Sequence, residues 1–214
     1  MILLLSLLSG TLTSYVNKES NFNPYFPANN NITLLYKSTF GECTTKYFKD
    51  DEFTISLSES DRFKYRQALI IKADGVYVKE VYQYYKIFLF IKKESTLIYG
   101  KPLLRFPLPL TPEQEWVWEG DEISDGDTTI VKVTGKAFKK ENITTSAGIF
   151  EAIKVETIVE GSSNTKNRVT EWYVEGIGLI KAKIIIEGGG VMGFLRDILG
   201  YGTIDFDLTE IKRL

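Results

Sequence analysis

Residues 144–181 read TTSAGIFEAIKVETIVEGSSNTKNRVTEWYVEGIGLIK, and this stretch decides the fold. Its first part, 150–159, mixes alternation of apolar and polar residues with a short apolar run. This is typical of a strand that is buried on one face and partly on the other. A polar turn at 161–167 follows, and the return strand carries Trp172 and Tyr173. We therefore predict an antiparallel hairpin at the centre of the chain.

More sheet extends from both sides of this hairpin. Gly176 and Gly178 permit a bend or bulge, after which the strand pattern resumes. Strand patterns separated by polar turns indicate a β-meander; they cover residues 32–40, 44–49, 53–58, 63–72, 75–85, 87–92, 128–138, 179–186 and 203–211. The prediction is a mainly β fold, a single curved antiparallel sheet or half-barrel, with a short helix near residues 191–199.

The predicted helix lies between glycine-rich segments near the end of the chain. Val191, Phe194, Leu195 and Ile198 recur at helical spacing, which favours a short amphipathic helix. Such a helix would plug one end of the sheet, and a lid or a membrane-touching element is the alternative. The three glycines before it are not a phosphate-binding loop, because no Lys-Ser/Thr pair follows them.

Composition narrows the class of protein. The chain has 214 residues, a length that one β domain can reach undivided. Aromatic residues make up 13%, with 12 Tyr and 13 Phe, and rings favour half-buried sheet surfaces. With 26 basic and 28 acidic residues, the net charge of -2 gives no basic field for nucleic acid. We expect a single β domain over 21–214 that binds no nucleic acid.

The missing residue types exclude several catalytic chemistries. The chain contains no histidine, which removes Ser-His-Asp and Cys-His arrangements and the usual imidazole metal sites. Cys43 has no second cysteine to pair with and no imidazole base, so we interpret it as a small apolar filler or passive thiol. A glycosidase-like carboxylate pair would have to be Glu171 with Glu175, roughly 13 Å apart at ~3.3 Å per residue, which is wide for that chemistry. We predict no catalytic residues and no cofactor.

Two charged stretches have competing interpretations. The acidic loop at 119–127 offers oxygen ligands around glycine, but its spacing does not match an EF-hand, and an ordinary hairpin loop without a metal is preferred. The segment at 62–93 is basic and rich in tyrosine. It could meet single-stranded nucleic acid or anionic lipid, although solvated strand faces beside a core edge explain it better.

The first residues resemble a secretory signal. Residues 1–11 have an apolar core followed by small residues but lack the basic flank, and the run is too short to span a bilayer. We expect 1–20 to be a signal segment and linker, with a buried N-terminal strand or helix as the alternative. Leu8-Ser9-Gly10 resembles a bacterial lipobox, but Thr11 stands where the lipidated cysteine would be, so the sequence leaves anchoring open.

Two proline-led segments share one spacing. Pro27 precedes Leu34 and Tyr36 by seven and nine residues, and Pro109 precedes Trp116 and Trp118 by the same intervals. In a strand, positions two apart place their side chains on the same face. The spacing is consistent with a weak internal repeat or with coincidence.

These features together resemble a known group of proteins. Its motif is a Thr-x-Ala-Gly-x-Phe-x-Ala turn and strand, followed by a Trp-Tyr strand that leads to Gly-x-Gly. The matching positions are Thr145, Ala147, Gly148, Phe150, Ala152, Trp172, Tyr173, Gly176 and Gly178, with Pro27, Pro109 and Trp116 at the proline-led segments. Over most of 25–183 the chain resembles the TapB-like exported bacterial proteins of unknown function, and more widely the LolA/LppX-like periplasmic lipoprotein carriers. Leu34 stands where the group commonly has Trp.

The resemblance implies a strongly curved sheet that faces the periplasm, and it carries no catalytic residues over. We expect a non-enzymatic, exported protein of the periplasm or cell envelope that binds a lipid or other hydrophobic ligand on the concave side of the sheet. A structural or assembly module that binds another envelope protein through sheet edges is the alternative. No transmembrane span is expected. The candidate ligand-binding residues are Trp116, Trp118, Trp172, Tyr173, Phe150 and Phe194.

Overall fold

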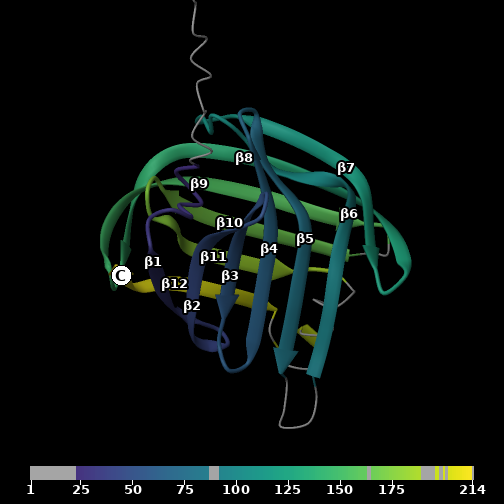
Figure 1. Ribbon diagram of the computed structural model, residues 1–214, viewed down its shortest axis with the longest axis horizontal. Coiled ribbons are helices and arrows are strands. Elements are labelled where there is room, and N and C mark those ends of the chain that lie inside the picture. The colour runs from purple at the N-terminus through teal and green to yellow at the C-terminus, as the bar shows by residue number, and fades with distance from the viewer. Residues whose placement is uncertain are drawn as a thin grey trace, which may run out of the picture.

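Antiparallel strands joined in sequence order form the sheet of the computed structural model (Figure 1). The structure describes residues 23–86, 92–162, 165–188, 196–197, 200 and 202–213. Within them the strands are β1 Ile32–Ser38, β2 Gly41–Asp50, β3 Phe53–Glu59, β4 Phe63–Lys72, β5 Gly75–Lys86, β6 Lys92–Pro107, β7 Glu115–Ser124, β8 Asp127–Thr145, β9 Gly148–Gly161, β10 Thr165–Val174, β11 Gly178–Ile186 and β12 Thr203–Arg213. The predicted meander is confirmed.

The sheet closes on itself, so the predicted half-barrel is wrong in one respect. β1 pairs with β12 from Ile32↔Arg213 to Ser38↔Phe206, with one bulge between Leu35 and Tyr36. This ladder joins the first strand to the last and completes a closed barrel. Closure removes the two free edges that an open curved sheet would present.

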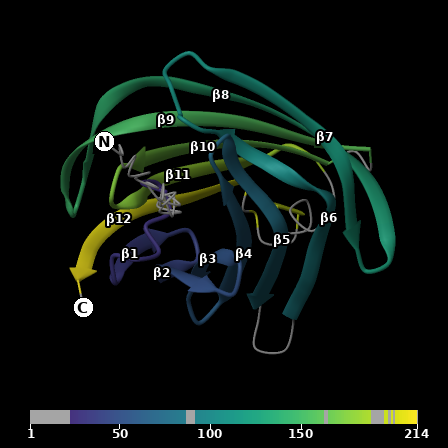
Figure 2. The ribbon, with the colours of Figure 1, turned by 45° about the horizontal axis from the view of Figure 1, so that its top comes forward.

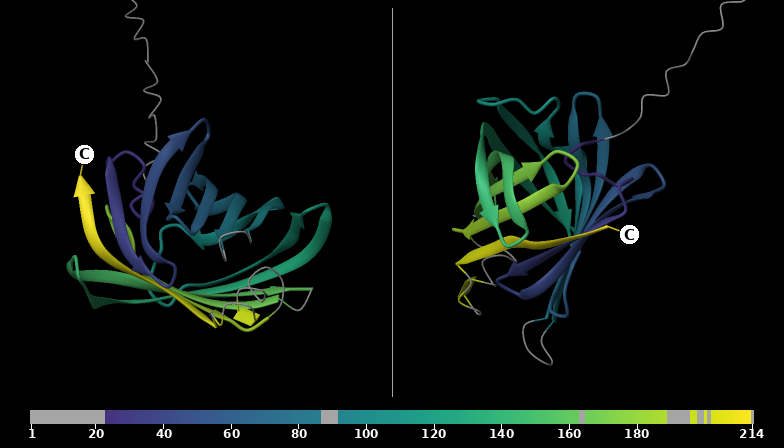
Figure 3. Two further views of the ribbon diagram at one scale, coloured as in Figure 1. Left: turned by 90° about the horizontal axis from the view of Figure 1, so that it is seen from below. Right: turned by 90° about the vertical axis from the view of Figure 1, so that its left-hand side faces the viewer.

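The barrel has two walls that face each other. Strands β2–β6 run up and down in Figure 1, whereas β8–β12 run across them. Figures 2 and 3 show the same two groups from other directions, curving around a common interior. Along both groups, buried residues alternate with more exposed ones, as in β2 and β8, because successive side chains point to opposite faces of a strand. The inward set forms the core.

One end of the barrel, here the plugged end, is filled by the segment Asn23–Ala28. The side chain of Asn23 turns this segment inward, because its Oδ1 accepts hydrogen bonds from the backbone N–H groups of Tyr25 (2.7 Å) and Phe26 (3.2 Å). The backbone N–H of Gly176 donates to the carbonyl of Pro24 at 2.8 Å, which ties the plug to the β10–β11 turn. The plugged end is therefore fixed by hydrogen bonds.

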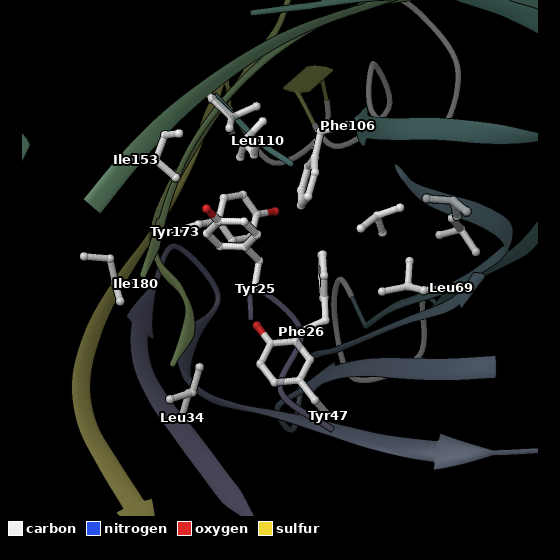
Figure 4. Packing of buried hydrophobic residues seen from close by; sticks show 14 of the residues in the cluster. Tyr25, Phe26, Leu34, Tyr47, Leu69, Phe106, Leu110, Ile153, Tyr173 and Ile180 are labelled. Atoms are coloured by element: carbon white, nitrogen blue, oxygen red, sulfur yellow. The ribbon is translucent and has the colours of Figure 1, made fainter. Parts of the chain in front are cut away.

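Aromatic rings pack the plugged end (Figure 4). Phe26 stacks on Phe106 with centroids 5.9 Å apart, and Tyr173 meets Phe106 edge-on at 5.5 Å. Tyr25 and Tyr47 pack edge-on against the same group, at 5.9 Å from Phe106 and 5.7 Å from Phe26, respectively. Such ring pairs add about 0.5–1.5 kcal/mol each beyond the area they bury. The opposite end, here the loop end, is where strands β5, β9 and β11 finish, at Lys86, Gly161 and Ile186.

Both proline-led segments arrive at the plugged end. One contains Pro27 and leads into β1, and the other contains the cis Leu108-Pro109 bond and leads into β7. Their matched strand residues, Leu34, Tyr36, Trp116 and Trp118, are all buried in the core. The shared spacing thus places large side chains in the core in both cases, and an internal repeat stays a prediction.

The ladder between these two halves at β6 and β7 is short. It comprises only Leu97↔Ser124, Ile98↔Ile123 and Tyr99↔Glu122 among the described residues. Just beyond it β6 bulges, with residues 99–102 opposite Lys79 of β5 alone. The ammonium of Lys79 donates to the carbonyl of Tyr99 at 3.1 Å. Tyr99 has no partner in the β5–β6 ladder because of the bulge, so this hydrogen bond links the two strands there.

The acidic stretch at 119–127 is mostly strand. β7 continues through Ser124, and a two-residue turn of Asp125 (φ 53°) and Gly126 (φ 88°) leads into β8. Positive φ at both turn residues suits the twist of a two-residue hairpin. The expected hairpin is present, but its loop is shorter than the sequence suggests.

The remaining fold predictions fall on undescribed parts of the chain. The helix expected near 191–199 lies outside the described residues except for Arg196 and Asp197, so the structure does not show it. The expected signal segment 1–20 and most of the strand expected at 87–92 also lie outside them. The structure therefore leaves the division into 1–20 and 21–214 as a prediction.

Glycine makes room for tryptophan inside the second wall. Trp116 lies directly across from Gly135 in the β7–β8 ladder, and a Cβ built on Gly135 would stand 2.2 Å from the indole ring. The ring is 7% exposed and has little freedom to move. Gly135 is therefore required by packing, whereas Gly100 in β6 has no neighbour closer than 3.9 Å to such a Cβ.

We predict that Gly135→Ala lowers the free energy of unfolding by about 1–3 kcal/mol, the usual cost of overpacking a core. Gly100→Ala is the matched control and should be neutral or slightly stabilising, because an added methyl there meets no close neighbour and reduces unfolded-state freedom. Urea denaturation of both variants checks this. Equal stabilities of the two variants would contradict the packing argument.

Candidate functional site

A cavity of about 430 Å³ lies inside the barrel between the two walls. Pockets for small organic ligands commonly have volumes of about 300–1,000 Å³. The rings of Phe26 and Tyr173 reach the cavity at the plugged end, and Phe40 and Phe63 line it near the loop end. The cavity is thus large enough for one small molecule.

The wall formed by β8–β12 is mainly aliphatic where it meets the cavity. Each of its five strands contributes at least one branched aliphatic side chain, and these include Val133, Val159, Val169, Ile184 and Ile204. Thr129, Thr157, Asn167 and Glu171 lie on the same side, and the Oδ1 atom of Asn167 is buried without a hydrogen-bond partner among the described residues. Apolar surface dominates this wall, so transfer of an apolar group onto it is favourable.

The wall formed by β2–β6 meets the cavity with a row of polar side chains, beside apolar ones that are Phe63, Val78, Val81, Leu97 and Leu103. Thr45, Ser58, Tyr65 and Gln83 line it, and each is directly opposite the next across the β2–β3, β3–β4 and β4–β5 ladders. Ser56 and Gln67 form a second opposed pair one step toward the plugged end. Interior-facing strand residues are usually apolar in a packed core. This wall therefore carries more hydrogen-bonding groups than the facing wall, although apolar side chains line both.

Arg105 crosses the interior from β6 and joins the walls. Its Nη2 lies 2.6 Å from Oε1 of Glu171 on β10 and 2.6 Å from the hydroxyl of Tyr173, and its Nη1 donates to Oε1 of Gln67 at 3.0 Å. The side chains of Arg105 and Glu171 are 17% and 12% exposed, although both lie inside the barrel. Because both line the cavity, this residual exposure is toward the cavity.

A β-bulge explains why Arg105 points inward. In the β5–β6 ladder Val76 is opposite Phe106 and Tyr77 is opposite Leu104, which leaves Arg105 as the extra residue. Bulges re-aim side chains in this way. Arg105 and its neighbour Phe106 can therefore both point into the barrel, against the usual alternation.

Burial and pairing set the protonation states around Arg105. Burial opposes the charge of Arg105, but attraction to Glu171 and the hydrogen bond to Tyr173 outweigh it, so the pKa of the guanidinium is raised. Burial raises the pKa of Tyr47 to about 12 and that of Tyr173 well above its ordinary value. The cluster thus presents one neutralised ion pair and neutral phenols at neutral pH.

Glu122 is a second carboxyl on the cavity, on β7. Burial raises its pKa, and the hydrogen bond from the Tyr99 hydroxyl to Oε2 at 3.2 Å partly opposes the shift. The shift favours the neutral form of this carboxyl inside the barrel. Glu122 is thus a third charged-type side chain on the cavity, beside the ion pair of Arg105 with Glu171.

The six residues predicted as ligand-binding have different positions. Tyr173 lines the cavity. Trp116 and Trp118 are buried in the core but are not part of its lining, and Phe150 is half-buried against that core. The indole N–H of Trp172 donates to Glu141 at 2.6 Å on the outer side, and Phe194 lies outside the described residues. The structure therefore brings only Tyr173 of this set to the cavity.

Glu171 and Glu175 do not form a carboxylate pair. Glu171 is ion-paired to Arg105 inside the barrel, whereas Glu175 lies beyond the end of β10 and is 57% exposed beside Lys140. The two groups are in separate environments and share no space for a substrate. This arrangement gives no support to the glycosidase-like hypothesis.

Other candidate groups are accounted for within the described residues. Cys43 is buried, and burial raises the pKa of its thiol to about 11, so the thiolate is scarce at neutral pH. In the part of the chain that the structure describes, no three His, Cys, Asp or Glu side chains gather into a metal-binding group. The described part also has no helix long and apolar enough to cross a membrane.

Sequence reasoning missed Arg105, Gln67 and Glu122. Arg105 precedes Phe106, and strict alternation would direct one of them outward. The pair of Gly100 and Pro102 nearby was the available signal, since such residues inside a strand mark bulges and edges. The sequence shows polar residues at alternate positions along β2–β6. The pattern within one strand does not determine which of its two faces points into the barrel.

Comparisons with known proteins give distant similarities. A family model described as DUF3108-like matches residues 121–192, a span from within β7 to beyond the end of β11. No curated protein matches the chain. The TapB-like and LolA/LppX-like resemblance is not among the matches and remains an expectation.

Two solved structures are similar over most of their length. A lipoprotein candidate from Parabacteroides distasonis ATCC 8503 is 11% identical, with a TM-score of 0.44 over 89% of this chain and 99% of that chain. An exported-protein candidate with a YmcC-like fold from Bacteroides fragilis NCTC 9343 is 12% identical, with a TM-score of 0.47 over 88% of this chain and 99% of that chain. Both similarities are too distant to carry an argument about function.

The Arg105–Glu171 pair allows a stability test by a double-mutant cycle. Glu171→Leu should lower the free energy of unfolding by about 3 kcal/mol, near the lower end for buried pairs, because it leaves the guanidinium unpaired beside a cavity that admits water. Arg105→Met should cost a similar amount. The double variant should be more stable than either single one, since no charge remains unpaired.

Urea denaturation of the four proteins measures the coupling. Additive losses in the double variant would show that the pair is not a coupled buried unit. Lys140→Met with Glu175→Leu is the control cycle, because that pair is exposed and should show a coupling below about 1 kcal/mol.

Proposed function

We propose that this protein is a non-enzymatic cell-envelope protein that binds a lipid or other hydrophobic small molecule inside its barrel. One observation carries the proposal: an interior cavity of about 430 Å³ with an aliphatic side chain from each of five consecutive strands on one wall. A packed core fills such space with its own side chains. Burial of a ligand against this wall is favourable at about 25 cal/mol per Å² of apolar area.

The closed end of the barrel and the paired charges on the cavity support binding over catalysis. The plugged end is closed by rings and hydrogen bonds, so a ligand would sit in a blind chamber. The arginine and glutamate side chains on the cavity, Arg105, Glu171 and Glu122, are paired or hydrogen-bonded in the structure. The assignment to the envelope rests on the signal-like apolar stretch of residues 1–11.

The proposal predicts that filling the cavity abolishes ligand binding. Ala182 lines the cavity and is 4% exposed, whereas the next residue, Lys183, points outward. Ala182→Phe should eliminate the fluorescence rise of the neutral apolar probe N-phenyl-1-naphthylamine, which wild type should show at about one probe per chain. Lys183→Phe adds the same ring on the outside and should leave binding unchanged.

Probe titration with circular dichroism checks both binding and folding. Equal binding by folded Ala182→Phe and wild type would place the probe elsewhere and overturn the proposal. Native mass spectrometry of protein purified from envelope extracts gives an independent result. Wild type should retain an organic-extractable ligand that Ala182→Phe lacks.

The short β6–β7 ladder favours a second candidate, an assembly module that binds another envelope protein through sheet edges. Past Tyr99↔Glu122 the described parts of the two strands make no ladder with each other, so β6 and β7 each present an edge there. Such edges accept an added strand. Val117, 63% exposed, lies in the part of β7 that makes no ladder with β6.

Pull-down from solubilised envelope membranes tests this candidate. Val117→Lys should release a partner that wild type retains, because a charge disfavours strand addition at that edge. Ile149→Lys is the matched control, since Ile149 is also an exposed aliphatic residue, 71% exposed, but lies at the β8–β9 turn. Equal retention by wild type and both variants would exclude this edge as the partner site.

A further inference from the structure

The two walls of the cavity restrict the chemistry of its ligand. Polar side chains stand opposite one another across four ladders of the β2–β6 wall, and they are Thr45, Ser58, Tyr65, Gln83 and Ser95. All of these except Ser95 line the cavity. On the facing wall, the aliphatic set Val133, Val159, Val169, Ile184 and Ile204 lines it. A ligand between the walls meets this polar row on one side, next to Val78, Val81, Leu97 and Leu103. On the other side it meets a mainly aliphatic surface that also holds the unpaired Oδ1 of Asn167.

Some polar side chains of this wall already form hydrogen bonds with one another. The hydroxyls of Thr45 and Ser58 are 2.7 Å apart, and the amide of Gln67 donates to the hydroxyl of Tyr65 at 3.2 Å. The hydroxyl of Ser56 and the amide nitrogen of Gln83 make no hydrogen bond with any described residue, although both side chains line the cavity and are less than 9% exposed. These two groups are available to a ligand.

A plain hydrocarbon chain would fit the polar row of this wall badly. Covering the unpaired Ser56 and Gln83 groups with methylene groups would cost about 1–3 kcal/mol each, because a buried polar group without a partner pays its full desolvation penalty. A ligand that carries hydroxyl or amide groups on the facing side would pair with them instead. The polar wall therefore favours a ligand that is polar along one side of its length.

The charges on the cavity favour a neutral ligand. Among the described residues that line it, Arg105 is the sole cation, and Glu171 already neutralises it at 2.6 Å. A ligand carboxylate would have to compete with Glu171 or remain unpaired in the interior, and an unpaired buried charge is costly. A fatty-acid anion is thus disfavoured.

We infer that the ligand is a neutral, rigid molecule with one apolar face and hydroxyl groups along the opposite face, as in a polyhydroxylated fused-ring steroid. This inference rests on the proposed binding function and specifies its ligand class. The apolar face lies against the aliphatic set of β8–β12. The hydroxyl groups face Ser56 and Gln83 on the polar wall.

Competition against N-phenyl-1-naphthylamine tests the ligand class. The competitors are a neutral trihydroxylated steroid alcohol, the matching sterol with a single hydroxyl, hexadecanol and hexadecanoate. The trihydroxylated compound should displace the probe at least about tenfold more tightly than hexadecanol, since one well-made hydrogen bond is worth roughly 1–1.5 kcal/mol. Hexadecanoate should be the weakest competitor.

Variants on the polar wall make the test specific. Ser56→Ala and Gln83→Met should each weaken the trihydroxylated competitor by about tenfold and leave the affinity for the probe unchanged, because the probe uses the apolar wall. Thr44→Val is the control, since Thr44 neighbours Thr45 on β2 but belongs to the opposite face. Thermal denaturation monitors folding of every variant.

The outcomes separate the ligand class from the binding function. If the probe binds and hexadecanol or hexadecanoate competes as well as the trihydroxylated compound, the ligand class is wrong and the binding function stands. The class is also wrong if Ser56→Ala and Gln83→Met have no effect. If the probe does not bind, titration calorimetry with the trihydroxylated compound decides: binding supports both proposals, and its absence overturns both.

Discussion

The pairing of β1 with β12 is the constraint on which the structure depends. The two strands lie at opposite ends of the chain, and their ladder from Ile32↔Arg213 to Ser38↔Phe206 converts a curved sheet into a ring. Without this ladder the inward side chains of both walls would face water. With it, the same side chains enclose a chamber whose lining differs from one wall to the other.

Closure of the ring also explains the polar cluster at the plugged end. A guanidinium is costly to bury, and Arg105 can be tolerated inside only because Glu171 reaches it from the opposite wall. The two residues lie 66 positions apart in sequence. Their contact therefore forms only when the two halves of the barrel are correctly placed against each other. The rings of Phe26 and Tyr173 pack around the pair.

Local patterns were sufficient for much of the fold. Strands such as β4 and β5 follow directly from alternation and the intervening Ala73-Asp74 turn, and the central hairpin has the predicted course. Closure could not be predicted, because no local pattern identifies the partner of the first strand. β6 was missed since Gly100 and Pro102 interrupt its pattern, although the strand tolerates them at a bulge.

The candidate site was less predictable than the fold for a physical reason. Aromatic residues were the natural choice for a hydrophobic site, but Trp116 and Trp118 fill core space beside glycines instead of lining the chamber. The residues that give the chamber its character are small or polar, such as Ser56 and Gln83. Their importance comes from register across several strands, which a single sequence does not display.

The three-pair ladder between β6 and β7 has a mechanical consequence. A closed sheet separates most easily between the two strands that share the fewest backbone hydrogen bonds. Every other pair of neighbouring strands has more paired positions in its described residues than β6 and β7. Transient widening of the barrel should therefore concentrate at this junction, beside the Lys79 ammonium that holds the bulged carbonyl of Tyr99. The barrel should therefore open first between β6 and β7, while the longer β1–β12 ladder stays paired.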